Sequence, residues 1–115
     1  MMSGTMFEQG DIVVVPFPFT DLSATKQRPA LVISKTEYNS RTEDVITCGI
    51  TSNLQNSDYS VIIDNSSLAE GTIPTKSRIK VDKLFTISKL LVKKKVAKLR
   101  EEEFSKVKAE LHKLI

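Results

Sequence analysis

Two short apolar runs flank a polar segment near the start of the chain, and they constrain the fold more than any other feature. Residues 12–15 are consecutive β-branched side chains, and residues 30–33 form a second apolar run after Arg28-Pro29. Runs of this length and composition are typical of buried strands rather than helices. Residues 20–27 between them contain the turn formers Asp, Ser and Thr. The pattern predicts strands at about 11–17 and 29–34 that hold a polar loop, and rigidly held loops often carry binding or catalytic residues.

The remaining pattern predicts a mainly β domain, a small antiparallel barrel followed by one helix. Short apolar segments alternate with turn formers, which is typical of such barrels. Further strands are expected at about 44–50, 59–64 and 78–81, separated by polar loops or turns at 35–43, 51–58 and 65–74. The segment 78–81 alternates basic and apolar residues, so a half-buried strand with one charged face is expected there. No linker or repeat divides residues 1–115, and a single domain is expected.

The period of the apolar residues changes at the C-terminal end of the sequence. An amphipathic helix is predicted over about 101–114, on the three- and four-residue spacing of Phe104, Val107, Leu111 and Leu114. Its first turn holds three glutamates, whose charge suits the positive end of the helix dipole. Arg100 is a poor N-cap, so a frayed or shifted helix start is expected.

Positive charge is concentrated in one segment. Residues 1–75 hold 4 basic and 9 acidic side chains, whereas residues 76–100 hold 10 basic and one acidic side chain. Such a segment is either an electrostatic footprint for a polyanion or a solvated, lysine-rich surface, and charge alone favours neither.

Several chemistries are disfavoured by what the sequence contains. The single cysteine, Cys48, and the single histidine, His112, offer no paired zinc spacing, and no P-loop or two-metal acidic cluster is present, so no metal and no cofactor are expected. Cys48 is expected to be a small buried residue and His112 a solvated helix residue. Phe17 and Phe19 are expected in the core, with a base-stacking platform as the alternative.

The compartment is predicted from the same features. A lone cysteine favours a reducing environment. No apolar run approaches the ~20 residues of a membrane span, and the N-terminal residues lack the regions of a signal peptide. A cytoplasmic protein without a membrane partner is expected.

Four segments, in order, resemble one protein family. Residues 10–19 and 26–34 read G-D-I-V-V-V-P-F-P-F and K-Q-R-P-A-L-V-I-S, and they are followed by Ile50-Thr51-Ser52 and by S-R-I-K-V-D-K-L-F-T-I at 77–87. Over about residues 10–99 the chain is similar to the MazF/PemK-like toxins of toxin–antitoxin systems. The resemblance implies the SH3-like barrel of the MazF/CcdB-like toxin fold, a homodimer, a single-stranded RNA substrate and a cognate antitoxin that blocks the RNA groove.

The resemblance also implies a set of catalytic residues. The family's catalytic Arg and Thr correspond to Arg28 and Thr51, and Ser52 extends the second match. Some members carry an Arg and an Asp two residues apart on a later strand, where this chain has Lys80 and Asp82. Other members carry a Glu in the loop before the R-P motif, where this chain has Ser23 and Asp21. Asp21 is a candidate substitute at a different spacing, so the general base stays open between Asp82 and Asp21. Each residue also has a plain structural interpretation, as a strand cap, an ion-pair partner or a turn.

These residues fit metal-independent cleavage, in which the ribose 2′-OH attacks the adjacent phosphorus and the 5′-oxygen leaves. A guanidinium suits the developing charge on the phosphorane oxygens. The loops at 20–27 and 51–58 are expected to contact bases and residues 76–83 to contact phosphates. The expected RNA-binding residues are Asp21, Lys26, Asn53, Lys76, Arg78 and Lys80.

Two other classes of function remain open at this point. Relatives of this fold include toxins that bind DNA gyrase without RNA chemistry, and fold alone does not decide function. A degenerate family member that binds RNA without cutting it is a further alternative. Retention of Arg28 and Thr51 favours the endoribonuclease.

Overall fold

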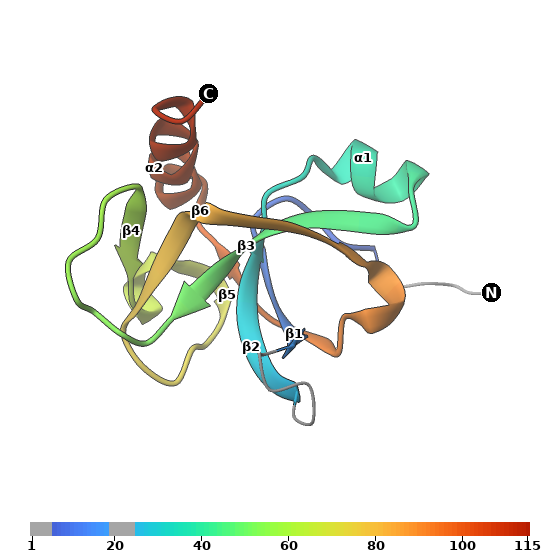
Figure 1. The fold of residues 1–115 in the computed structure, drawn as a ribbon, viewed down its shortest axis with the longest axis horizontal. Helices are drawn as coiled ribbons and strands as arrows, with labels where there is room; N and C mark the ends of the chain where they lie inside the picture. The colour runs from blue at the N-terminus through green and yellow to red at the C-terminus, as the bar shows by residue number, and fades with distance from the viewer. Residues whose placement is uncertain (1–5, 19–24) are drawn as a thin grey trace.

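The structure, a computed structural model, describes residues 6–18 and 25–115. Among these residues, seven strands form one antiparallel sheet with the order β4-β6-β3-β2-β1-β7-β5 (Figure 1). The strands are β1 (Asp11–Pro18), β2 (Thr25–Val32), β3 (Asp44–Thr51), β4 (Ser60–Ile63), β5 (Leu68–Gly71), β6 (Ser77–Ser88) and β7 (Lys94–Leu99). Two α-helices, α1 (Thr36–Arg41) and α2 (Glu101–His112), and two 3-10 turns, η1 (Asn65–Ser67) and η2 (Lys89–Leu91), complete the described elements.

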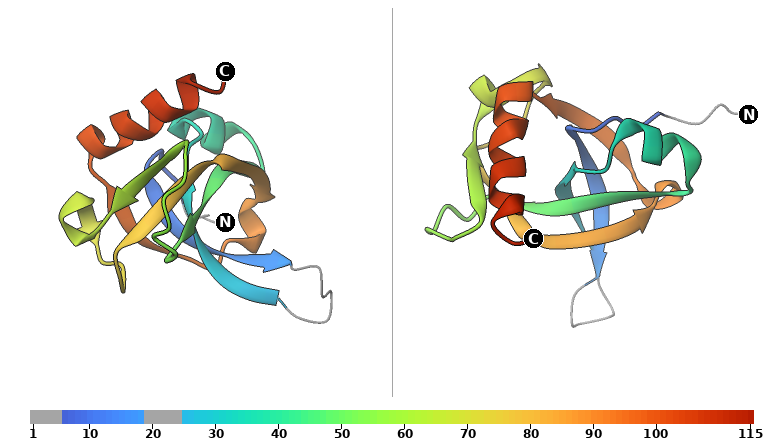
Figure 2. Two further views of the ribbon diagram at one scale, coloured as in Figure 1. Left: turned by 60° about the vertical axis from the view of Figure 1, so that its left-hand side comes forward. Right: turned by 90° about the horizontal axis from the view of Figure 1, so that it is seen from above.

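The sheet curls because its two edge strands are tied together. The single turn η1 joins β4 to β5, and Asp64 and Ser67 cap it reciprocally. The Ser67 carbonyl also accepts a hydrogen bond of 3.0 Å from the Arg100 amide at the start of α2. The sheet therefore forms a half-barrel, which confirms the predicted mainly β barrel fold with a C-terminal helix (Figures 1 and 2).

A bulge in β6 shapes the barrel. Gly49 of β3 pairs with Lys80, but its neighbour Cys48 pairs with Leu84, so residues 81–83 have no partners on β3. Insertions of this kind bend a strand and increase its twist. The first part of β6 pairs with both β3 and β4, whereas the part after the bulge pairs with β3.

Buried apolar side chains form two clusters. The larger cluster contains residues of β1 to β7 together with α2, including Ile12, Leu31, Ile79 and Val107. The smaller cluster contains Phe7, Val13, Val15, Ala30, Val32 and Val45, with Phe85, Ile87 and Val92 packed against it. Alternate residues of β1 and β2 enter different clusters, because successive strand side chains point to opposite faces. Both faces of these strands are therefore buried.

Helix α2 packs against β4 and β6, as Figure 2 shows. Phe104 and Val107 are buried on its inner face, which confirms the predicted amphipathic helix, although it ends at His112 rather than 114. Arg100 makes no side-chain cap, as its residue type predicts. Neither α1 nor α2, the α-helices of the described part of the chain, is long and apolar enough to cross a membrane.

The prediction of a polar turn at 35–43 was wrong, because residues 36–41 form α1. This short helix has no apolar stripe that would reveal it. It is held by Asn39, which is 1 % exposed and donates hydrogen bonds to the carbonyls of Phe7 and Ser34. A buried asparagine anchors this helix to the rest of the domain, a role that an apolar residue has in most helices.

Four strand predictions also need correction. Strand β2 begins at Thr25 rather than 29, and β6 continues to Ser88 rather than ending at 81. Strand β5 lies within the segment expected to be a turn at 65–74, and β7 was not expected. The lysines of β7 concealed its strand pattern. Lys95 lies 3.2 Å from the fully buried Asp11, and Lys98 lies 2.6 Å from Glu8, so these charges are paired within the sheet.

The glycine at the end of β5 generates a stability prediction. Gly71 has φ +74°, and an added Cβ would lie 2.1 Å from the Val96 carbonyl oxygen. Gly10 also has a positive φ, but its added Cβ would meet nothing closer than 3.8 Å. We expect Gly10→Ala to cost about 1–2 kcal/mol of unfolding free energy, the strain of a left-handed backbone. Gly71→Ala should cost clearly more in urea denaturation, and equal losses would contradict the close packing of β5 on β7.

Candidate functional site

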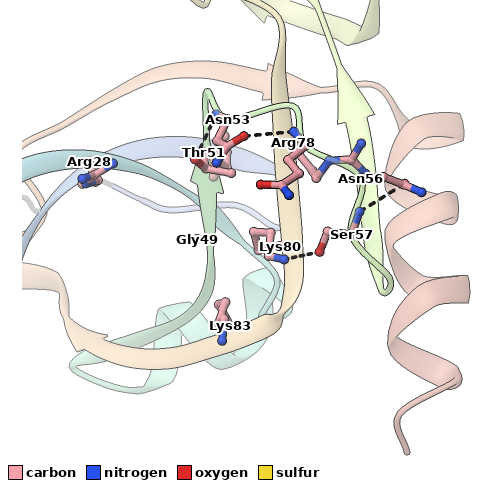
Figure 3. Close-up of a pocket in the computed structure, with 11 residues that line it drawn as sticks. Arg28, Gly49, Thr51, Asn53, Asn56, Ser57, Arg78, Lys80 and Lys83 are labelled. Carbon is pink, nitrogen blue, oxygen red and sulfur yellow. Dashed lines mark hydrogen bonds between the residues drawn. The ribbon is translucent and has the colours of Figure 1, made fainter.

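A cleft of about 430 Å³ opens where β3 ends, beside the first part of β6 (Figure 3). Strand β2 contributes Arg28, and the loop from β3 to β4 forms the rim. Its lining residues are Arg28, Gly49, Ile50, Thr51, Asn53, Gln55, Asn56, Ser57, Arg78, Lys80 and Lys83. Three strands and one loop that are distant in sequence therefore meet here.

Strand register explains why polar groups line this cleft. Thr51 pairs with Arg78 and Gly49 pairs with Lys80, while the intervening pair is Ile50 and Ile79. Directly opposed residues project to the same face of a sheet, and the next pair projects to the other face. The two isoleucines are buried in the larger core. The hydroxyl and the two cations consequently face the cleft.

The loop at the rim is held by the cations and by its own polar groups. Arg78 donates from Nη1 to the Ser60 hydroxyl at 2.7 Å and from Nη2 to the Leu54 carbonyl at 3.3 Å. Lys80 donates to the Ser57 hydroxyl. The backbone N–H of Asn53 donates to Thr51 Oγ1 at 3.1 Å. The Thr51 oxygen is therefore an acceptor in this bond, and the hydrogen of the Thr51 hydroxyl can point elsewhere.

The electrostatics of the cleft have one sign. Four basic residues line it, and none of its described lining residues is acidic. Anions within such a concave, like-charged surface experience a focused positive potential. The arrangement can therefore bind an anionic ligand with two arginines, two lysines and the Thr51 hydroxyl in its lining.

A second cleft, of about 500 Å³, shares Arg28 with the first. Its lining includes Lys26, Ser52 and Lys94 together with residues 72–75. No acidic residue lines it within the described part of the chain. Arg28 thus stands between two cationic clefts.

The predicted site residues are only partly brought together. Arg28, Thr51, Asn53, Arg78 and Lys80 share the first cleft, and Lys26 and Ser52 line the second. Lys76 and Asp82 are exposed and line neither of these clefts. Asp21 lies outside the described residues, as do Phe19 and Ser23.

One expectation about this surface was wrong. Arg78 was predicted to lie on the exposed, charged face of a half-buried strand, but its exposed fraction is 6 %. The face is covered because the 53–57 loop folds over it. Sequence reasoning also missed Lys94, since β7 was not predicted, and did not single out the amides of Gln55 and Asn56.

The reactive side chains outside the clefts are consistent with their expected inert roles. Cys48 is fully buried, and burial, with a smaller effect of the Asp82 charge, raises the pKa of its thiol to about 12. His112 is exposed near the end of α2. Within residues 6–18 and 25–115, no three His, Cys, Asp or Glu side chains gather as metal ligands would.

Comparison with known proteins supplies an independent observation. Residues 8–115 match the family model of the PemK-like, MazF-like toxin of type II toxin-antitoxin systems. No protein with curated annotation matches the sequence significantly.

Solved structures share the fold. A crystal structure of MazE-MazF from Deinococcus radiodurans is similar with a TM-score of 0.79 and 18% identity, covering 96% of each chain. An endoribonuclease from Mycobacterial species has a TM-score of 0.74 and 17% identity, covering 95% of this chain and 90% of that one. An endoribonuclease in complex with its cognate antitoxin, also from Mycobacterial species, has a TM-score of 0.74 and 18% identity, covering 92% and 91%. At these identities, the likeness shows the fold alone.

The inert role assigned to the buried Cys48 thiol can be tested directly. Because the pKa of Cys48 is raised to about 12, only about one thiol in ten thousand is ionised near pH 8, and the thiolate is the reactive form. We expect a thiol reagent such as DTNB to react with the folded protein only as fast as it unfolds. The same reagent should label the urea-unfolded protein at once. Rapid labelling of the folded state would contradict the inert assignment.

Proposed function

Because the chain belongs to the PemK-like, MazF-like toxins of type II toxin–antitoxin systems, we propose that it is an endoribonuclease that cuts single-stranded RNA without a metal ion. The observation that carries this proposal is the cleft in which Arg28 and Thr51 lie among cations, with no acidic residue among the described residues that line it. Phosphates bind such a surface, and cytoplasmic RNA is the proposed substrate.

The proposed reaction is an internal transfer at phosphorus. The ribose 2′-oxygen loses its proton and bonds to the adjacent phosphorus, and the bond from phosphorus to the 5′-oxygen breaks. The 5′-oxygen takes up a proton, so the products carry a 2′,3′-cyclic phosphate and a 5′-hydroxyl. No hydrolytic water is consumed in this step.

Arg28 and Thr51 are proposed to stabilise the charge that develops in this reaction. The planar guanidinium of Arg28 offers several donors to phosphorane oxygens and stays charged. Thr51 Oγ1 accepts a hydrogen bond from the backbone N–H of Asn53. The hydrogen of the Thr51 hydroxyl can therefore donate to a phosphate oxygen. Ser52, which lines the second cleft, is proposed to contact the RNA on the far side of Arg28.

The proton acceptor is proposed among two carboxylates. Asp82 is exposed on the β6 bulge and does not line the described clefts, so it serves only if RNA reaches over the bulge. Asp21 precedes Arg28 in the sequence. The two variants Asp21→Asn and Asp82→Asn separate these candidates. The one that abolishes RNA cleavage while RNA still binds would identify the general base.

RNA is proposed to run from one cleft to the other across Arg28. Lys26 and Lys94 line one end of this path, and Lys80 and Lys83 line the other. Sequence-specific recognition of RNA relies on unstacked, single-stranded bases. Asn53 and its neighbours in the rim loop offer amides for such contacts.

Two protein partners are proposed, a second copy of the chain and a cognate antitoxin. The names of two similar structures pair MazE with MazF and an endoribonuclease with its antitoxin, and we extend that partnership to this chain. Exposed leucines after the β6 bulge, Leu84, Leu90 and Leu91, offer apolar area for the homodimer.

The cleavage reaction is tested with purified protein and mixed-sequence single-stranded RNA in excess EDTA. We expect cutting with 2′,3′-cyclic phosphate ends. Arg28→Ala should slow it by roughly 10²–10³-fold, the usual cost of removing a donor to a developing oxyanion. Thr51→Val should slow it as well. Lys108→Met, which removes one charge from the exposed face of α2, is the matched control.

Each other outcome selects a different function. Tight RNA binding without cutting would favour a degenerate binder, and neither binding nor cutting would favour a protein target such as DNA gyrase. Cutting by Arg28→Ala at the parental rate would indicate a contaminating nuclease and remove Arg28 from the site.

The dimer is tested by sedimentation. We expect a species of about twice the 12.9 kDa chain mass. Leu84→Glu should shift it toward the monomer, because it places a charge in the proposed apolar contact. Leu114→Glu is the control, since Leu114 is similarly exposed but lies beyond α2. If Leu114→Glu dissociates the protein and Leu84→Glu does not, the contact is on the other face.

A further inference from the structure

Arg78 occupies an unusual position for a charged residue. It lies on β6 between two partners, Thr51 on β3 and Ile62 on β4, and is 6 % exposed. Two of its guanidinium nitrogens donate to a serine hydroxyl and a backbone carbonyl. Its Nε is buried and has no hydrogen-bond partner among the described residues. Arg78 is one of the residues that line the first cleft.

This buried charge lacks a counter-ion. Within residues 6–18 and 25–115, no carboxylate pairs with Arg78, and the neighbouring cleft charge on the same strand face, Lys80, has the same sign. An uncompensated buried charge is costly, and native structures that keep one usually pair it with an anion. The missing anion is therefore to be sought in a ligand.

We propose that Arg78 and Lys80 form a subsite for a phosphate of the RNA backbone that is not the phosphate being cut. Arg78 supplies a buried positive charge at the cleft lining, and Lys80 supplies the second charge. Figure 3 shows Arg28 well apart from Arg78 and Lys80, on the other side of Thr51. The scissile phosphate between Arg28 and Thr51 and this second phosphate thus occupy different parts of one cleft. The identity of the ligand as RNA rests on the proposed function.

A purely structural role for Arg78 makes a different prediction. Its bonds to Leu54 and Ser60 anchor the rim loop. If anchoring were its purpose, Arg78→Met would destabilise the protein with or without phosphate. If the charge awaits an anion, Arg78→Met should leave the Tm in chloride unchanged or raise it, because replacing an unpaired buried charge by an apolar group relieves its desolvation.

The first experiment measures the Tm in sodium phosphate and in sodium chloride at equal ionic strength. A ligand that binds the folded state stabilises it, so phosphate should raise the Tm of the parent and of the Lys108→Met control. The rise should be clearly smaller in Arg78→Met and in Lys80→Met, where the remaining rise comes from the Arg28 site and from the general stabilising effect of phosphate. An equal rise in the parent and Arg78→Met would overturn the subsite.

The second experiment uses a single-stranded RNA with 2′-O-methyl groups, which lacks the attacking hydroxyl. Fluorescence anisotropy gives its Kd as a function of salt. Loss of one phosphate contact should lower the slope of log Kd against log salt by about 0.7 for a single strand. We expect that change in Arg78→Met and not in Lys108→Met, and an unchanged slope in Arg78→Met would contradict the proposal.

A third experiment is an NMR titration of the parent protein with phosphate. It keeps the proposal testable if Arg78→Met fails to fold. The Nε–H signal of a buried arginine is visible in nitrogen-15 spectra, and it should shift on titration with phosphate, with Arg78→Lys providing the assignment. An Nε–H signal that stays fixed at saturating phosphate would overturn the inference. The 2′-O-methyl RNA reports binding separately from cutting. Arg78-dependent binding of this RNA, together with no cleavage of unmodified RNA, would refute the proposed function and leave the subsite standing.

Discussion

The pairing of β3 with β6 is the constraint on which the cleft depends. Its register places Ile50 and Ile79 in the core, while Thr51 and Arg78 lie on the face toward the cleft. The same pair of strands therefore stabilises the fold and forms the site. The bulge at 81–83 then bends β6 away, which ends the polar face and lets the same strand cover the second apolar cluster. A one-residue slip would exchange the two faces and place Arg78 and Lys80 in the apolar core. The same strand register therefore determines both the packing of the core and the geometry of the site.

The basic segment 76–100 resolves into two groups of cations with different environments. On β7, Lys95 and Lys98 pair with Asp11 and Glu8, and Lys95 also lies 3.6 Å from Glu70. The Glu8 contact raises the pKa of Lys98, and the Lys98 contact lowers that of Glu8, as expected of an ion pair. In the cleft, Arg78, Lys80 and Lys83 have no carboxylate among the described lining residues. Neither alternative drawn from charge alone describes the whole segment, because part of it pairs within the sheet and part lines the cleft.

Much of the fold was predictable because its signals are local. The β-branched run at 12–15 and the three- and four-residue period of Phe104 and Val107 each report on their own element. Helix α1 was missed because a buried asparagine, with partners distant in sequence, fixes it. Strand β7 was missed because Asp11 and Glu8 neutralise lysines that read as solvated surface. In both cases the decisive contact is long-range and polar, and periodicity does not report it.

The site shows the same division between local and long-range information. Arg28 and Thr51 were found through sequence motifs, and the structure places both in one cleft. The burial of Arg78 could not be predicted, since it requires β4 on one side and the rim loop above it. Burial changes what this arginine can do, because a desolvated guanidinium interacts more strongly with an anion than an exposed one does. An exposed Arg78 would add only screened attraction along the strand, whereas a buried one would attract an anion in the cleft more strongly. By covering Arg78, the rim loop would therefore strengthen the proposed phosphate subsite.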